Sequence, residues 1–218
     1  MLFDLDGTLV DSVYQHVLAW HETLEAAGIA LSVWRIHRRI GMSGGLFIKA
    51  LEREVGRAVG DEEAGRLRAA HAEAYVRRLP DIRPLPGARE LLGALTAMGV
   101  PWAIATSGSD KTARPALALL GVGADTPLIT RDHVTYAKPN PDLFLAAADR
   151  LGVNPRESFV VGDSIWDLLA AQRAGALGVG VLSGGYGREE LEQAGAYRVY
   201  EDPAGLLGHL DELGIRSA

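Results

Sequence analysis

Short apolar stretches alternate with stretches of helical periodicity from residue 87 to the end of the chain. The apolar stretches lie at residues 100–105, 128–130, 158–161, 178–182 and 197–200. The helical stretches lie at residues 88–98, 111–120, 141–151, 165–174, 188–193 and 204–213. Strands that alternate with helices in this way pair in parallel and carry the helices on the faces of the sheet. The pattern therefore predicts an α/β fold built on a parallel sheet.

The segment that precedes this alternation has helical patterns only. They run over residues 13–28, 32–41, 46–59 and 62–78. Ser12 and Gln15 have the spacing of a capping box at the start of the first helix, and Pro80, Pro84 and Pro86 follow the last one. We therefore expect one domain made of residues 1–12 and 86–218, with residues 13–85 inserted into it as an all-helical domain.

The inserted segment also differs in charge. Residues 35–89 carry twelve basic and seven acidic side chains, a net charge of +5, whereas the whole chain has a net charge of −6. Solvated helix surfaces explain such an excess in the simplest way. The alternative is a basic insertion that faces an anionic substrate.

The composition excludes several classes of protein. The 218 residues contain no cysteine, so disulfides and thiolate chemistry are excluded. The chain starts with acidic rather than basic residues, unlike a signal peptide, and no apolar stretch reaches membrane-spanning length. The negative net charge argues against a dedicated nucleic-acid binder. We expect a cytoplasmic monomer or homodimer that acts on a small molecule, without nucleic-acid or membrane partners.

Two acidic residues, Asp4 and Asp6, follow the first apolar residues of the chain. In an extended strand, residues two apart point to the same face, so the two carboxylates would lie side by side among apolar neighbours. Carboxylates that leave water at such short separation repel each other and lose hydration, so they require a positive partner.

Polar residues also follow the later strands of the predicted sheet. They are Thr106 and Ser107, then Lys138, then Gly162, Asp163 and Asp167. Parallel sheets bind ligands at the carboxyl ends of their strands, so these residues should converge with the first acidic pair. A second acidic pair beside the first indicates a hard cation such as Mg²⁺, which prefers oxygen ligands.

Four short motifs occur in the order found in one known family. They are Asp4-Leu5-Asp6-Gly7-Thr8, Thr106 with Ser107 behind it, Lys138, and the segment Gly162-Asp163-Ser164-Ile165-Trp166-Asp167. In these motifs the chain resembles the haloacid dehalogenase-like hydrolases, in the phosphatase branch that has a helical cap inserted after the first strand. The segment Ser183-Gly184-Gly185-Tyr186-Gly187 is similar to the phosphoglycolate-phosphatase-like members. The resemblance implies a Rossmann-like, three-layer core of residues 1–12 and 86–218 and a helical cap of residues 13–85.

The resemblance implies a role for each of the carboxylates. Asp4 is expected to attack phosphorus, to form an aspartyl-phosphate, and to bind Mg²⁺ through its other oxygen. Asp6 is expected to bind the metal through its backbone carbonyl, and its side chain to act as the general acid and base. Asp163 is expected to complete the protein's metal ligands, and Asp167 to position Lys138 or a metal-bound water.

The phosphoryl group is expected to be held by a further set of groups. By the same resemblance, these are the Thr106 hydroxyl and the backbone N–H groups near Ser107 and Leu5, with Lys138 neutralising both Asp4 and the phosphoryl group. Only three residues precede Asp4, so either the first strand is short or the natural chain begins earlier.

The loop around residues 38–45 is the candidate for recognition of the leaving group. It contains Arg39, Gly41 and Met42 and interrupts two helical patterns with three glycines in five residues. A helix end with a loose connector is the simpler explanation. Since a cap must open and close over a substrate, we expect this loop to contact a small phosphomonoester, such as phosphoglycolate or a sugar phosphate.

Three alternatives remain open on the sequence. A sugar-phosphate mutase would use the same core, and a phosphonate-cleaving enzyme would need a cap lysine, for which Lys49 is the candidate. A receiver-type signalling domain would also combine acids, a hydroxyl, a lysine and Mg²⁺. It has no helical insertion after its first strand, which disfavours it.

Overall fold

The computed structural model describes residues 1–123 and 125–216. Within these residues, the main sheet has six strands in the order β5-β4-β1-β6-β7-β8. The strands are β1 (Leu2–Phe3), β4 (Ala103–Ala105), β5 (Leu128–Ile129), β6 (Phe159–Gly162), β7 (Leu177–Val181) and β8 (Ala196–Tyr200). All neighbouring strands pair in parallel. The predicted α/β fold on a parallel sheet is confirmed.

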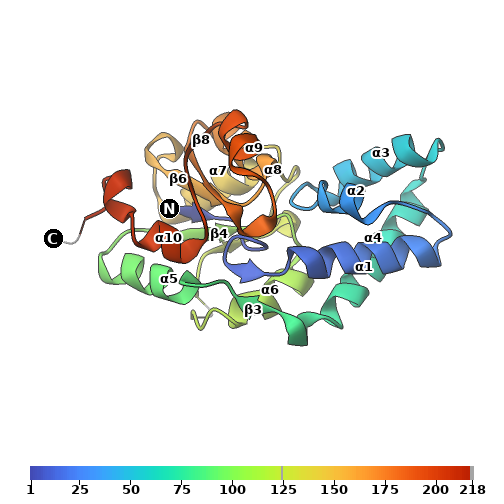
Figure 1. The fold of residues 1–218 in the computed structure, drawn as a ribbon, viewed down its shortest axis with the longest axis horizontal. Helices are drawn as coiled ribbons and strands as arrows, with labels where there is room; N and C mark the ends of the chain where they lie inside the picture. The colour runs from blue at the N-terminus through green and yellow to red at the C-terminus, as the bar shows by residue number, and fades with distance from the viewer. Residues whose placement is uncertain (124, 217–218) are drawn as a thin grey trace.

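Helices cover both faces of this sheet, which makes three layers (Figure 1). One face packs against α5 (Ala88–Ala97), α6 (Asp110–Ala118) and α10 (Pro203–Leu207). The other packs against α7 (Asp142–Leu151), α8 (Ile165–Ala174) and α9 (Arg188–Gln193). A 3-10 helix, Leu210–Leu213, follows α10.

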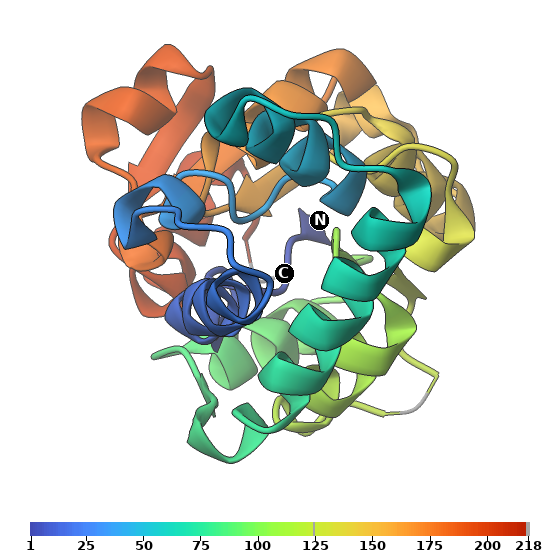
Figure 2. The ribbon, with the colours of Figure 1, turned by 90° about the vertical axis from the view of Figure 1, so that its right-hand side faces the viewer.

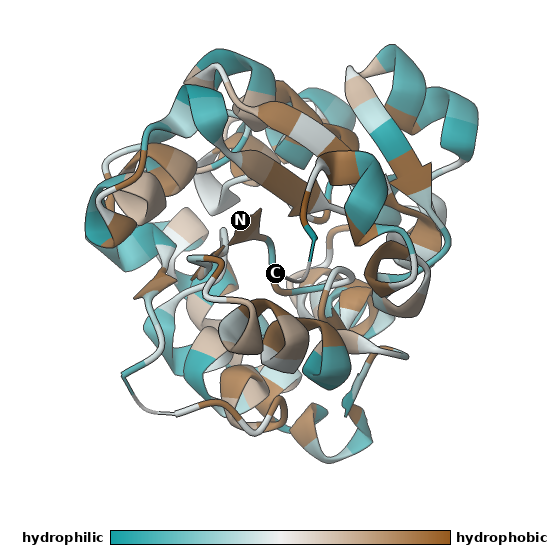
Figure 3. Ribbon diagram, turned by 90° about the vertical axis from the view of Figure 1, so that its left-hand side faces the viewer, coloured by the Kyte–Doolittle hydropathy of each residue, from teal (hydrophilic) through white to brown (hydrophobic). Residues whose placement is uncertain are grey.

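The side chains of β1 show how the two faces are filled. Leu2 belongs to the cluster that includes Phe144 of α7, and Phe3 to the cluster that includes Leu91 of α5. Adjacent residues of a strand point to opposite faces, so a strand buried on both faces is a continuous apolar run. Figure 3 shows the hydrophobic residues concentrated on the strands, with hydrophilic residues on the outer helices.

The order of the strands places a binding site at the end of β1. From β1 the chain goes to β4 and β5 on one side, and then returns to β6, β7 and β8 on the other. The loops on the two sides of such a switch point diverge and leave a crevice at the carboxyl ends of the strands. The residues that follow β1, β4 and β6 therefore border one crevice.

The inserted helices lie to one side of the sheet (Figure 1). They are α1 (Val13–Ala26), α2 (Val33–His37), α3 (Gly44–Val55) and α4 (Asp61–Val76). Seen from this side, the inserted helices lie in front of the sheet domain (Figure 2). A separate apolar cluster, which includes Trp20, Ile36, Phe47, Leu51 and Leu67, holds the four helices together.

A two-stranded antiparallel ladder joins the inserted segment to the sheet domain. Val10 pairs with Pro84 and Asp11 with Arg83 in the strands β2 (Val10–Asp11) and β3 (Arg83–Pro84). The sequence does not predict these strands, because two residues are too few to show a period. The ladder and the separate cluster support the boundaries at residues 13 and 85, which remain our proposal.

Several elements are shorter than predicted. The helix expected over residues 32–41 ends at His37, and residues 38–42 form turns that bring Ser43 N to 2.9 Å from the Lys138 carbonyl oxygen. The strand expected from residue 100 begins at Ala103, after Pro101, which has no N–H for a ladder. The last helix divides into α10 and the 3-10 helix. Within the described ranges, no helix combines the length and apolar character needed to cross a bilayer.

Candidate active site

Asp4 lies directly after β1 and is buried. Its backbone N–H donates to the Val161 carbonyl oxygen of β6 at 2.9 Å, which fixes the residue at the centre of the sheet. The Lys138 ammonium donates a hydrogen bond to Asp4 Oδ1 and lies 2.8 Å from Asp167 Oδ1. Lys138 is fully buried, so these two carboxylates are its charge partners in the interior.

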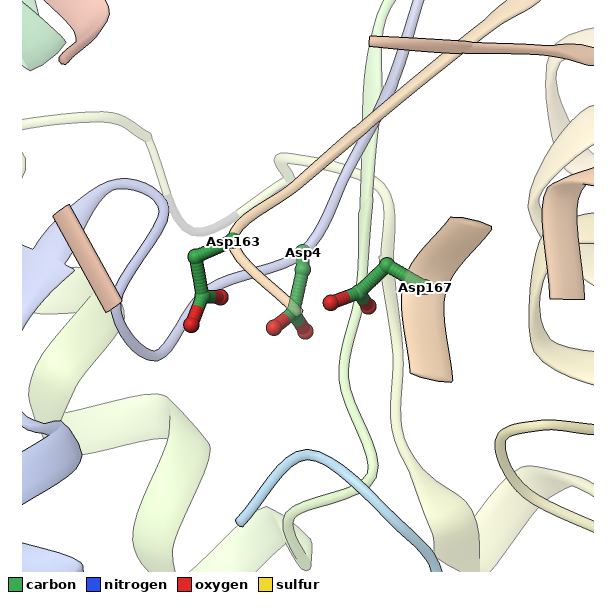
Figure 4. A group of neighbouring side chains, drawn as sticks. All are labelled: Asp4, Asp163 and Asp167. Atoms are coloured by element: carbon green, nitrogen blue, oxygen red, sulfur yellow. The ribbon is translucent and has the colours of Figure 1, made fainter. Parts of the chain in front are cut away.

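Two further buried carboxylates lie beside Asp4. Oxygen atoms of Asp4, Asp163 and Asp167 all lie within 4.8 Å of one another. Figure 4 shows Asp4 between the other two. Asp163 accepts a 3.0 Å hydrogen bond from Thr8 Oγ1, and Asp167 Oδ2 accepts one of 3.2 Å from the backbone N–H of Ser164 at the start of α8. These hydrogen bonds fix the orientations of the two carboxylates.

Gly7 makes the close approach of the first loop to Asp163 feasible. Its φ is 79°, in the left-handed region, and a Cβ there would lie 2.6 Å from Asp163 Oδ2. The chain therefore turns sharply directly after the two acids. Thr8, which follows, holds Asp163.

The carboxylate cluster fits a hard cation. Three buried carboxylates face the Lys138 ammonium, so the centre has an excess of negative charge when all three are ionised. The donor set consists of oxygen atoms, which suits Mg²⁺. The side-chain cluster contains Asp4 and Asp163, as predicted for the metal, and also Asp167. Binding of the metal by the backbone carbonyl of Asp6 stays a prediction.

Burial and mutual repulsion set the charge states of the cluster. Burial raises the pKa of Asp4 to about 7, because the opposing effect of Lys138 is offset by Asp167 and Asp6. Burial and the charges of Asp167 and Asp4 also raise the pKa of Asp163 well above its usual value. Burial alone would lower the pKa of Lys138, but Asp167 and Asp4 outweigh it and raise that pKa. A bound cation would favour the ionised carboxylates.

The Asp6 carboxylate faces the inserted helices. Its Oδ1 lies 3.2 Å from His16 Nε2, accepts a 2.6 Å hydrogen bond from Ser12 Oγ and lies 3.3 Å from the Tyr75 hydroxyl. Burial would raise the pKa of Asp6, but the charge and hydrogen bond of His16, with the hydrogen bond of Ser12, lower it to about 2. Asp6 is therefore ionised at neutral pH, whereas Asp4 is only partly so.

The surroundings of Asp6 include residues that the sequence analysis did not predict as functional. His16 Nδ1 lies 3.1 Å from His71 Nε2, and the His16 ring stacks on Tyr75 with centroids 3.8 Å apart. Burial lowers the pKa of His71 well below its ordinary value, and His16 and Arg131 lower it further. The two histidines are 55 residues apart in the chain, so no local spacing indicates the pair.

The structure corrects the predicted role of Ser12 as the cap of the first inserted helix. Ser12 occupies the N-cap position of α1, as expected, but its hydroxyl makes no capping hydrogen bond to the helix. The hydroxyl donates to Asp6 instead, because an ionised acceptor forms the stronger hydrogen bond.

Groups that can hold a phosphoryl oxygen lie on the other side of Asp6. Thr106 Oγ1 lies 3.4 Å from Asp6 Oδ2 and accepts a 2.9 Å hydrogen bond from the Gly108 backbone N–H. The Ser107 hydroxyl is buried and has no hydrogen-bond partner among the described residues. Within residues 1–123 and 125–216, the backbone N–H groups of Leu5 and Ser107 donate to no protein acceptor. Unsatisfied donors of this kind are suited to an anionic ligand.

A cavity of about 80 Å³ lies between these loops and the inserted helices. It brings together seven of the predicted site residues, four from the sheet domain (Asp4, Asp6, Thr106 and Ser107) and three from the loop between α2 and α3 (Arg39, Gly41 and Met42). The Arg39 guanidinium is engaged within the inserted segment, since it donates to the Arg35 carbonyl oxygen at 2.6 Å and to Glu54.

Several contacts hold the inserted helices against the sheet domain. Ser43 N donates to the carbonyl oxygen of Lys138, and the Tyr186 hydroxyl donates to the Arg38 carbonyl oxygen at 3.0 Å. The Arg38 guanidinium pairs with Glu190 and lies 4.0 Å from the centre of the Tyr186 ring. These contacts hold the loop between α2 and α3 beside the cavity, which it lines through Arg39, Gly41 and Met42.

Comparisons with known proteins agree with this geometry. A model of the haloacid dehalogenase-like hydrolases matches residues 1–175. Hexitol phosphatase A of Escherichia coli K12 is 36% identical over 176 residues, covering 80% of this chain and 78% of that protein. A phosphoglycolate phosphatase of Rhodospirillum rubrum is 36% identical over 216 residues, covering 94% of this chain and 88% of that protein. The crystal structure of a hydrolase from Pseudomonas syringae has a TM-score of 0.95, with 56% identity and 97% of both chains covered.

Proposed function

This chain belongs to the haloacid dehalogenase-like hydrolases, and on that premise we propose that it is a Mg²⁺-dependent phosphatase of a small phosphomonoester. The observation that carries the proposal is the position of Asp4. It lies at the end of β1, two residues before Asp6, and accepts a hydrogen bond from the buried Lys138. The carboxylates of Asp163 and Asp167 lie beside it. Phosphoryl transfer depends mainly on positioning and charge compensation, which this arrangement can supply.

In the proposed reaction, an Asp4 carboxylate oxygen attacks phosphorus and the bond from phosphorus to the leaving oxygen breaks. Asp6 gives its proton to that oxygen, so the alcohol leaves neutral and an aspartyl-phosphate remains. A water molecule then attacks phosphorus, Asp6 takes its proton, and Asp4 and inorganic phosphate are released.

Asp6 must carry a proton in the first step, although its low pKa keeps it ionised without substrate. The negative charge of an incoming phosphoryl group would raise the pKa of Asp6, because like charges disfavour ionisation. The Ser12 and Tyr75 hydroxyl groups and the His16 imidazole fix the direction of the carboxyl group during both transfers. His16, Ser12 and Tyr75 are thus positioning residues.

The remaining site residues would bind the phosphoryl oxygens. Thr106 Oγ1 and the N–H groups of Leu5 and Ser107 supply hydrogen bonds, and Lys138 supplies positive charge beside Asp4. Mg²⁺ would be held by Asp4, Asp163 and the Asp6 carbonyl, and when bound it would supply positive charge to Asp4 and the phosphoryl group. Asp167 orients Lys138 from its place at the start of α8.

Names of the relatives support a small substrate, namely phosphoglycolate or a hexitol or sugar phosphate. The cavity volume of about 80 Å³ favours the smaller of these. The alternative of a phosphonate-cleaving enzyme is disfavoured, because Lys49 is exposed and lines a separate groove with Trp34 and Arg53. A mutase would return an isomeric sugar phosphate in place of inorganic phosphate.

The test is release of phosphate from p-nitrophenyl phosphate and from sugar phosphates, with Mg²⁺ or with excess chelator. We expect activity only with Mg²⁺, and a loss of at least about 10³-fold in Asp4→Asn, because an amide is a poor nucleophile. Asp149→Asn, an exposed acid on α7, is the matched control and should keep full activity. Undiminished turnover in chelator or in Asp4→Asn would refute the mechanism, and isomerisation without phosphate release would favour the mutase.

A further inference from the structure

Two arginines converge on one side of the cavity. Arg68 lies on α4 of the inserted segment, and Arg131 begins the 3-10 helix Arg131–His133 that follows β5. Both line the cavity that holds Asp4 and Asp6. A Cβ added to Gly44 would lie 3.1 Å from Arg131 Nη1 and 3.3 Å from Arg68 Cδ, so the two side chains meet at this residue.

The protein neutralises the charges of the two arginines only in small part. Arg131 has only the exposed Asp132 near it among the described residues, with Nε and Oδ1 3.8 Å apart. Over the same residues, no carboxylate lies within ion-pair distance of Arg68. Most other arginines of the inserted segment pair with glutamates: Arg35 and Arg39 with Glu54, Arg57 with Glu63, Arg66 with Glu62, and Arg77 and Arg78 with Glu22.

The two guanidinium groups also repel each other. Burial lowers the pKa of Arg131, Asp132 offsets part of this effect, and the neighbouring charge of Arg68 lowers the pKa further. The Arg131 side chain is 33% exposed, so solvent screens the repulsion only in part. An anion between the two arginines would remove this repulsion and gain charge-assisted hydrogen bonds.

We propose that Arg68 and Arg131 form a second anion subsite, and that the leaving group of the substrate carries its own anionic group, a carboxylate or a second phosphate. This inference rests on the proposed phosphatase function. The planar fork of an arginine matches both anions, and the two arginines approach from different parts of the fold. The phosphoryl group binds at Asp4 and Lys138, and the second anion binds at Arg68 and Arg131.

The subsite would also link substrate binding to closure. Arg68 belongs to the inserted helices and Arg131 to the sheet domain, so the second anion bridges the two. A neutral leaving group makes no such bridge and leaves two like charges facing each other. Selectivity for anionic leaving groups thus appears in kcat/KM, which measures stabilisation of the transition state relative to free enzyme and substrate.

The test compares substrates that differ only in the second charge. The matched pairs are phosphoglycolate with 2-hydroxyethyl phosphate, 3-phosphoglycerate with glycerol 3-phosphate, and 1,3-propanediol bisphosphate with 3-hydroxypropyl phosphate. We expect wild-type kcat/KM to favour the anionic member of at least one pair by about tenfold or more, as charge-assisted hydrogen bonds of ordinary strength provide. The first two pairs identify a carboxylate, and the third a phosphate.

Arg68→Gln and Arg131→Gln should each reduce that preference, and the double variant should abolish it. Arg66→Gln is the matched control, because Arg66 lies on the same helix but pairs with Glu62 at the surface, and it should keep the wild-type preference. Hydrolysis of all substrates without a preference, or a preference that survives in the double variant, would overturn the subsite and leave the phosphatase standing. If no member of the three pairs is hydrolysed, the subsite is refuted, and the phosphatase function is refuted with it only if p-nitrophenyl phosphate is not hydrolysed either.

Discussion

Replacing the nucleophile Asp4 with asparagine should stabilise the metal-free protein while abolishing its activity. Asp4 is buried beside Asp163, Asp167 and Asp6, and its pKa is raised from 3.8 to about 7. The folded state therefore disfavours the ionised carboxylate relative to the unfolded chain. Asparagine resembles the protonated form in shape and carries no charge, so it removes this penalty.

The size of the effect follows from the pKa shift. A group whose pKa is raised on folding destabilises the protein as the pH rises above 3.8, and the full loss is reached above about pH 7. At 1.36 kcal/mol per pKa unit, ionised Asp4 costs about 4 kcal/mol at pH 8 and less than about 2 kcal/mol at pH 5. For a chain of this length, about 4 kcal/mol corresponds to roughly 8–16 °C in Tm.

The assay is thermal unfolding of the wild type and Asp4→Asn in chelator at pH 5 and pH 8. The variant should unfold at the higher temperature, and the difference should grow with pH. Mg²⁺ should stabilise the wild type, by about 2.7 kcal/mol at a hundred times its Kd, and should stabilise Asp4→Asn much less. Asp149→Asn should unfold like the wild type at both pH values. A variant that is no more stable than the wild type at pH 8, or a difference that does not change with pH, would refute the reasoning.

Two further predictions concern Asp6 and the loop between α2 and α3. Asp6→Asn should lower the free energy of unfolding by about 2 kcal/mol at pH 7, because the pKa of Asp6 is lowered from 3.8 to about 2. Steady-state kinetics should show that kcat falls by about 10²–10⁴-fold, and titration calorimetry should show that Mg²⁺ binding is retained. Turnover at the wild-type rate would show that another group transfers the proton. Gly41→Ala should reduce kcat/KM at least about tenfold, because φ is 92° and the new Cβ would lie 2.8 Å from Ser164 Oγ, at a backbone cost of about 1–2 kcal/mol. Gly45→Ala, where a Cβ would meet nothing within 4 Å, is the control, and equal kinetics in the two variants would contradict the role given to the loop.

The sequence by itself determined the class of fold and the core of the site. Alternation of apolar and helical stretches predicts a parallel sheet, because the spacing of apolar residues in each stretch indicates the secondary structure of that stretch. The rule that ligands bind at the carboxyl ends of strands then brings Asp4, Thr106, Lys138 and Asp163 together, as the structure does. These inferences need only local pattern and topology.

Only the tertiary structure decided what surrounds Asp6 and what faces the leaving group. Ser12 has the sequence position of a helix cap, yet its hydroxyl bonds to Asp6, and the His16–His71 pair joins residues far apart in the chain. In the sequence, Arg68 does not differ from the other arginines of its basic segment. In the fold, its side chain lies near that of Arg131, and no carboxylate of the described residues lies within ion-pair distance of Arg68. Charge partners of this kind depend on how the inserted helices pack over the sheet, and no period or spacing in the chain records that packing.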